Sequence, residues 1–191
     1  MKRMVVQHTN RRSQTLYLHK GTTKTGKSKY FFSLNNHGEL VDTLPQGFEI
    51  YETPNAQVFL RRKQLKLITD EELAIVEEGL KRDCPHERCR VEVRQATITV
   101  FTPDQNLAEF EKTIGFVSGL RGTGVFDRFT SHSPLLQFVL ANKEKRTFIT
   151  RRYCFLGSVD DWIEISRPGK LTTLVKKFVR HLGQDSFYEL Y

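Results

Sequence analysis

The sequence predicts an α+β protein: a small N-terminal antiparallel β-meander packed beside an α+β unit with a mainly antiparallel sheet and three helices. Three observations predict this class. Alternating apolar and polar residues fill the first third, helical periodicity appears near Thr69, and strand-like and helical segments then follow without a regular βαβ order. The 191 residues, 38% of them hydrophobic, suffice for one ordinary domain or two small ones. We expect residues 1–66 to form a basic antiparallel β-unit and residues 67–191 to form the α+β unit.

The first third contains four short segments whose side chains alternate between apolar and polar. This alternation is typical of half-buried strands. Turn-forming sequences rich in Gly, Pro and Asn separate the segments, so we expect a meander of antiparallel strands. The four segments are residues 15–20, 29–34, 48–51 and 57–62.

The second part carries three segments with apolar residues at helical spacing. The first begins at Thr69, which forms a capping-box pattern with Glu72. The second covers residues 102–119 and opens on another capping-box pattern with a proline in its first turn. The third covers residues 170–183 and ends at a glycine.

The remaining periodic segments of the second part predict strands. A first hairpin joins two alternating runs, and a long hairpin turns near residues 142–145. A short strand follows the long hairpin, after a turn expected at Val159–Asp161. The expected strands are residues 90–95, 97–102, the two arms of 135–156, and 161–165.

The positive charge of the chain is concentrated in its first third. The net charge is +8 at pH 7, and residues 1–66 carry all of it, with 12 Lys and Arg against 4 Asp and Glu. Residues 67–191 hold 18 of each and are neutral overall. A one-sided basic segment attracts polyanions such as nucleic acid, an acidic protein or a membrane surface.

Residues 21–28, GTTKTGKS, match the nucleotide-binding pattern called the P-loop. A working P-loop stands between a buried strand and a helix whose N-terminal amides surround the phosphates. Here the residues after Ser28 alternate and are rich in aromatics, which predicts a strand. We therefore interpret the segment as a hairpin loop and expect no hydrolysis of ATP or GTP. The lysines on and beside it are Lys20, Lys24, Lys27 and Lys29.

The main functional hypothesis is nucleic-acid binding by the basic β-unit, without catalysis. Lysines crowded on one loop repel each other, and phosphate groups relieve that repulsion. Aromatic and cationic side chains that share a sheet face suit stacking on bases, although the same aromatics could instead pack against the second part of the chain. The expected nucleic-acid-binding residues are Arg11, Arg12, Tyr17, His19, Lys20, Lys24, Lys27, Lys29, Phe31, Arg61, Arg62 and Lys63.

Two other functions stay open. The first is a protein-interaction or accessory subunit that binds an acidic protein partner through basic faces, since no convincing catalytic set is visible. The second is a metal-dependent nuclease whose divalent ion is held by Asp160, Asp161 and Glu164. Residues three apart on a strand face opposite sides, which weakens the second alternative.

Cysteine, histidine and apolar content set further expectations. Cys84, His86 and Cys89 offer half of a zinc site, and no second Cys/His pair completes it. We expect no metal, cofactor or catalytic residue, and we expect a binding protein more than an enzyme.

The three sparse cysteines fit a reducing compartment, and no apolar run approaches the ~18 residues of a membrane span. Together with an N-terminus unlike a secretory signal, these features predict a cytoplasmic protein with no membrane partner.

Overall fold

The computed structural model describes residues 4–84, 88–104, 130–156 and 159–190. The described residues divide into two compact units. The first contains residues 4–63 and Thr130, and the second contains the other described residues from Gln64 onward. Whether the chain divides into independently folding domains at residues 66 and 67 stays a prediction, because compactness alone does not test independent folding.

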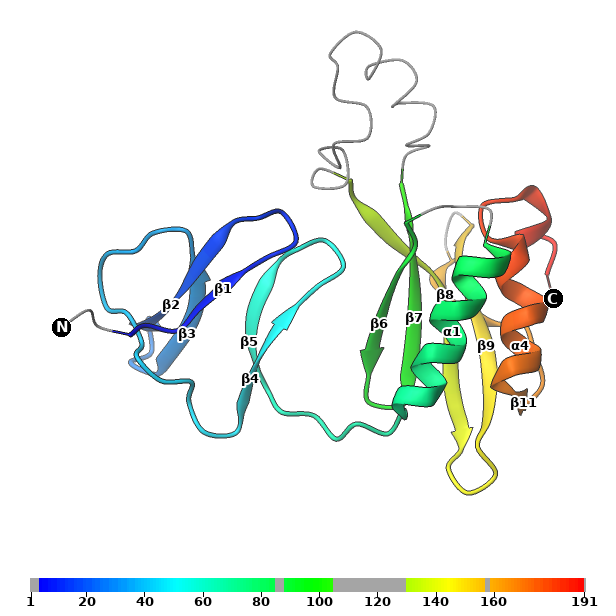
Figure 1. The fold of residues 1–191 in the computed structure, drawn as a ribbon, viewed down its shortest axis with the longest axis horizontal. Helices are drawn as coiled ribbons and strands as arrows, with labels where there is room; N and C mark the ends of the chain where they lie inside the picture. The colour runs from blue at the N-terminus through cyan, green and yellow to red at the C-terminus, as the bar shows by residue number, and fades with distance from the viewer. Residues whose placement is uncertain (1–3, 85–87, 105–129, 157–158, 191) are drawn as a thin grey trace, which may run out of the picture. The chain divides into compact units, whose positions relative to one another are not determined.

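The first unit is built from two small antiparallel sheets, coloured blue to cyan in Figure 1. The three-stranded sheet has the order β1-β2-β3, and in the second sheet β4 pairs with β5. The strands are β1 (Gln7–Thr9), β2 (Thr15–Thr22), β3 (Ser28–Ser33), β4 (Phe48–Glu52) and β5 (Val58–Arg62).

The single meander expected for this unit is wrong, because β3 and β4 do not pair. After β3 the chain crosses back along the edge of β2 that β1 leaves open. The amide of Lys20 donates to the carbonyl of Glu39, and the amide of Val41 donates to that of Leu18. The returning segment therefore leads the chain away from β3, so that β4 does not pair with β3. Instead β4 pairs with β5 in a separate sheet.

The same five-residue turn closes all three hairpins of the first unit. In residues 10–14, 23–27 and 53–57, the first amide donates to the fifth carbonyl, and the fourth amide donates to the first carbonyl. The side-chain oxygen of the first residue, an Asn or a Thr, also accepts from the fifth amide. The fourth residue has positive φ: 59° at Ser13, 78° at Gly26 and 62° at Ala56. Side-chain capping by Asn or Thr thus defines the turn more than glycine does.

The second unit is a six-stranded antiparallel sheet with two α-helices on one face (Figure 1). The strand order is β10-β9-β8-β7-β6, and the short β11 pairs with β9. The strands are β6 (Arg90–Arg94), β7 (Thr97–Pro103), β8 (His132–Asn142), β9 (Thr147–Leu156), β10 (Val159–Glu164) and β11 (Gly169–Lys170). The helices are α1 (Asp70–Asp83) and α4 (Leu171–Phe178), and 3-10 turns follow at Val179–His181 and Asp185–Phe187.

The core of the second unit lies between the sheet and its two helices. Phe138, Phe148 and Phe178 are fully buried there, with aliphatic residues from both layers. The two helices approach closely at Gly79, where a methyl group added to the glycine would stand 2.2 Å from a Val175 methyl carbon. The apolar residues that recur at helical spacing in each helix thus face the sheet, as expected for amphipathic helices.

The predicted fold class is wrong in its number of helices. The protein is α+β in the broad sense, but strands make up 43% of the described residues, which hold three sheets and two α-helices. The capping box at Thr69 and Glu72 is confirmed at the start of α1. The helix expected from Thr102 does not begin there, because Thr102 and Pro103 still pair with β8 as the last residues of β7. The rest of that predicted helix lies outside the described residues.

Candidate functional site

The β2–β3 hairpin carries the four lysines that stood out in the sequence. We call residues 15–33 the lysine hairpin. Lys20, Lys24, Lys27 and Lys29 are all exposed, and within the described part of the chain none of them pairs with a carboxylate. Four uncompensated positive charges on one hairpin make it a surface that attracts anions.

The P-loop match in this hairpin lacks the structure of a P-loop. Ser28–Ser33 is a strand, as predicted, and it pairs with β2. The loop amides are also occupied, since the amide of Gly26 donates to the carbonyl of Thr23 and the amide of Lys27 donates to the Thr23 Oγ1. These backbone donors are turned into the loop and not toward a phosphate.

One face of the lysine hairpin combines an aromatic ring with a cation. The register pairs His19 with Phe31, and their rings stack with centroids 5.2 Å apart. The Nζ of Lys29 lies 5.4 Å from the centre of the Phe31 ring. Phe31 is 40% exposed, so its ring is accessible from solvent. An exposed ring beside a lysine is an arrangement that binds bases and phosphates together.

His19 and Tyr17 lie on the same face but are less accessible than Phe31. His19 is only 6% exposed, and its Nε2 is 2.9 Å from the carbonyl oxygen of Asn35. Tyr17 pairs with Ser33 and is half-buried. His19 therefore supports the Phe31 ring from below and does not itself offer a contact surface.

Two of the expected arginines form ion pairs within the first unit. Arg11 binds Glu52, with 3.1 Å between Nε and Oε1, and its backbone amide donates to the same carboxylate. Arg61 binds Glu49 at 2.7 Å and lies 4.0 Å from the centre of the Tyr51 ring. These two guanidinium groups are already neutralised, so they contribute little free positive charge.

Glu52, at the end of β4, links the two sheets of the first unit by binding residues of the three-stranded sheet. The Nε2 of His8 lies 2.8 Å from its Oε2, beside the two contacts from Arg11. Burial raises the pKa of Glu52, but the hydrogen bonds from His8 and the Arg11 amide and the charge of Arg11 outweigh it, so the pKa is below the ordinary value. The ionised carboxylate therefore joins the β1–β2 turn to β4.

The other expected residues lie away from the Phe31 face. Arg12 is half-buried, whereas Arg62 and Lys63 are exposed at the end of β5. Arg61 shares the outer face of the β4–β5 sheet with Phe59, which is 49% exposed. Arg12 lies in the β1–β2 turn, whereas Arg61 and Arg62 belong to β5 in the other sheet. Sequence reasoning missed this separate sheet, because sheet membership depends on distant pairing.

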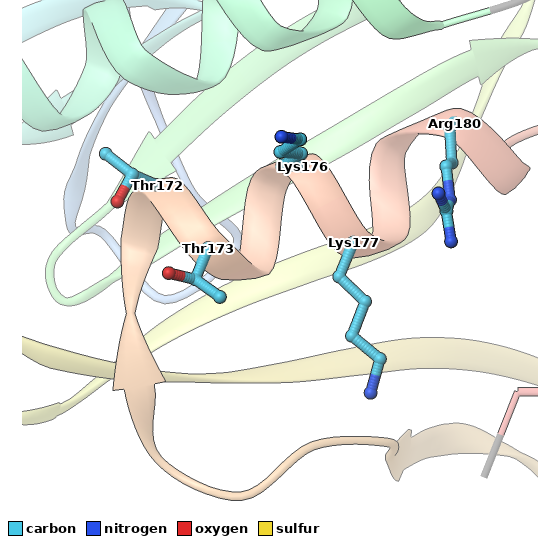
Figure 2. Close-up of a pocket in the computed structure, with 5 residues that line it drawn as sticks. All are labelled: Thr172, Thr173, Lys176, Lys177 and Arg180. Atoms are coloured by element: carbon cyan, nitrogen blue, oxygen red, sulfur yellow. The ribbon is translucent and has the colours of Figure 1, made fainter.

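Two hollows lie beside basic residues, one in each unit. In the first unit, a hollow of about 620 Å³ is lined by Lys20 and Tyr30 of the lysine hairpin and by Gly38, Glu39, Leu40, Val41, Thr43 and Pro45. In the second unit, a hollow of about 430 Å³ lies on the solvent side of α4 (Figure 2). Its lining residues are Thr172, Thr173, Lys176, Lys177 and Arg180, so this basic helix face also suits anions.

The acidic residues considered for a nuclease do not converge. Val159–Asp161 belongs to β10 and is not the turn that the sequence suggested. Asp161 accepts a hydrogen bond from the amide of Trp162, and Asp160 and Glu164 are exposed on the same strand. Among the described residues, no three His, Cys, Asp or Glu side chains lie where they could share a metal ion.

The cysteines considered for a zinc site come together in part. The Sγ atoms of Cys84 and Cys89 lie 3.2 Å apart, whereas His86 lies outside the described residues. Cys154 is buried in β9, as predicted for a small core residue. The sequence spacing indicated a cluster at these cysteines but not that the two sulfur atoms touch.

No helix in the described part of the chain is long and apolar enough to cross a membrane. Comparison with protein-family models, curated proteins and solved structures finds no match for this chain.

Proposed function

We propose that this protein binds nucleic acid through the lysine hairpin, chiefly by contacts to phosphate groups. The observation that carries the proposal is the set of four exposed lysines without carboxylate partners on one hairpin. Each lysine is a compact charge that pairs with a phosphate and releases condensed counterions from the nucleic acid. The binding is therefore expected to be salt-dependent and largely indifferent to sequence.

The ion pairs of the first unit reduce the number of residues that we expect to contact nucleic acid. Arg11 and Arg61 are engaged by carboxylates, and His19 is buried under Phe31. The proposed contact set is therefore smaller than the sequence alone suggested. It contains Lys20, Lys24, Lys27 and Lys29 for phosphates and Phe31 for a base.

The first prediction concerns the phosphate contacts. We expect replacement of Lys24 and Lys27 by alanine to weaken binding to any duplex and to flatten the slope of log K against log salt by about two units, one for each lost contact. Fluorescence anisotropy of a labelled duplex across a salt series measures both quantities.

A charge-matched variant controls for net charge. Replacing Lys176 and Lys177 on α4 removes the same two charges from a different exposed face. We expect this variant to keep the slope of the unmodified protein. Equal loss in both variants, or no binding tighter than ~10⁻⁴ M at low salt, contradicts the proposal.

The second prediction concerns Phe31. We expect Phe31→Ala to weaken binding to a single strand by ~1–3 kcal/mol, because a base loses its stacking partner, and to leave duplex binding nearly unchanged. Phe59→Ala removes a ring of similar exposure from the other sheet and serves as the control. Parallel titrations with single-stranded and duplex DNA of the same sequence measure the difference. Loss of both activities together contradicts a stacking role.

An acidic protein partner is the second candidate, and the basic hollow on α4 favours it (Figure 2). The two candidates use different lysines, so the same variants separate them. If Lys176→Ala with Lys177→Ala abolishes capture of an acidic polypeptide such as poly-glutamate while DNA binding persists, the helix face is a protein-docking surface.

A further inference from the structure

Two thiols meet where α1 ends and β6 is about to begin. The Sγ atoms of Cys84 and Cys89 are 3.2 Å apart, and both side chains are half-buried against the core. A disulfide bond needs about 2.05 Å between the sulfur atoms, so a small side-chain adjustment brings them to bonding distance.

Fixed elements hold both cysteines in place. Cys84 is the C-cap of α1, and its amide donates to the carbonyl of Leu80. On the other side, the carbonyl oxygen of Arg88 lies 3.2 Å from the His132 Nε2, and β6 starts at Arg90 in register with β7. The helix end and the strand start therefore set the distance between the thiols, which makes their contact a built feature.

We propose that Cys84 and Cys89 are a site of reversible oxidation, at which a small disulfide such as oxidised glutathione joins them in an intramolecular disulfide. Cys154 takes no part, since it is buried in β9 at 4% exposure. Because the third cysteine of the chain is buried, oxidation is expected to give a single product, the bond between Cys84 and Cys89.

The reaction is thiol–disulfide exchange in two steps. One protein thiolate attacks a sulfur of oxidised glutathione, forms a mixed disulfide and releases one glutathione thiolate. The second protein thiol then gives up its proton and attacks the protein sulfur of the mixed disulfide, which releases the second glutathione. Two S–H bonds become one S–S bond, and the two protons and two electrons leave with two glutathione molecules.

The hydrogen bond with Cys84, followed by burial, raises the pKa of the Cys89 thiol. This direction agrees with the close contact of the two sulfur atoms, and it keeps Cys89 protonated while the pair is reduced.

The test uses the full chain in glutathione buffers of increasing oxidised-to-reduced ratio, followed by acid quenching and alkylation after denaturation. We expect the number of alkylated thiols to fall from three to one as the ratio rises, without a bound glutathione, and to return to three with dithiothreitol. Peptide mapping should place the bond between Cys84 and Cys89. Cys154→Ser is the control and should fall from two alkylated thiols to none.

Stability provides a second readout that does not depend on alkylation. Oxidation should raise the melting temperature of the unmodified chain and of Cys154→Ser, but not that of Cys84→Ser, because only the first two can close the bond. Three alkylated thiols at every ratio, a stable glutathione adduct in place of a bond, or a bond that includes Cys154 overturns the proposal.

Discussion

At the scale of single residues, Glu52 connects the two small sheets of the first unit. Its carboxylate receives His8 and Arg11 from the β1–β2 region while its backbone belongs to β4. Beside it, the side-chain amide of Asn10 donates to the carbonyl of Ala56. These polar contacts replace the strand pairing that the two small sheets lack.

We expect Glu52→Gln to lower the free energy of unfolding at neutral pH by ~1–2 kcal/mol, because charged hydrogen bonds become neutral ones. The pKa of Glu52 is lowered in the folded protein, so its stabilisation is present above the ordinary pKa of a glutamate and is lost as the pH falls through the lowered value. The difference between the variant and the unmodified protein should therefore shrink in acid. Urea denaturation at several pH values measures it.

Glu49→Gln is the matched control, because Glu49 pairs with Arg61 on the more exposed face of the same strand. That pair should contribute only ~0.5 kcal/mol. A pH-independent loss in Glu52→Gln would assign the effect to packing and not to charge.

At the scale of the elements, the close contact between α1 and α4 depends on Gly79, which has no Cβ atom. Gly79 is buried, and a Cβ there would overlap Val175. We expect Gly79→Ala to destabilise the protein by ~1–3 kcal/mol through overpacking, despite the better helix propensity of alanine. Thermal or urea denaturation measures the loss.

The double variant with Val175→Ala tests the cause. Val175→Ala alone leaves a cavity, but in the double variant the new methyl group of residue 79 takes up part of that space. The combined loss should be smaller than the sum of the two single losses by ~1 kcal/mol or more. Additive losses would show that the clash is absent.

Local periodicity is sufficient to predict most elements but not their partners. Alternation located β2 to β5 and the hairpins of the large sheet, and the capping box located α1. The three-residue β1 is too short to show a period. The separation into two small sheets was missed because pairing depends on hydrogen bonds to the distant residues 39–41.

For the candidate site, too, the sequence predicts local features but not long-range contacts. The residues on the Phe31 face follow from alternation, whereas the burial of His19 depends on a loop that returns from Asn35. The neutralisation of Arg11 depends on a glutamate 41 positions away. Such long-range contacts leave no local pattern in a single sequence.

At the scale of the whole molecule, apolar burial among the described residues is very unequal between the two units. The described residues of the first unit contribute Leu18, Ala56 and Val58 as buried hydrophobic residues, whereas those of the second share a continuous core of 17 buried residues. Since buried apolar contacts set the free energy of local opening, the first unit should open more readily.

We expect native-state hydrogen exchange to show this order directly. Amides in the central strand β8 and its neighbour β9 should exchange slowest, and those of β2 and β3 should exchange well before them. Exchange monitored by mass spectrometry on peptides resolves the two groups. Equal protection would mean that the chain unfolds as one cooperative body.

The single tryptophan gives this asymmetry an optical consequence. Trp162 lies on β10 with its ring at 79° to that of Tyr153, 5.1 Å away, so its emission reports the environment of the large sheet. The first unit contains tyrosines but no tryptophan. A denaturation curve recorded at tryptophan wavelengths therefore follows the second unit, while far-UV circular dichroism records strands from both. The midpoints of the two curves should differ, with the circular dichroism signal beginning to change first.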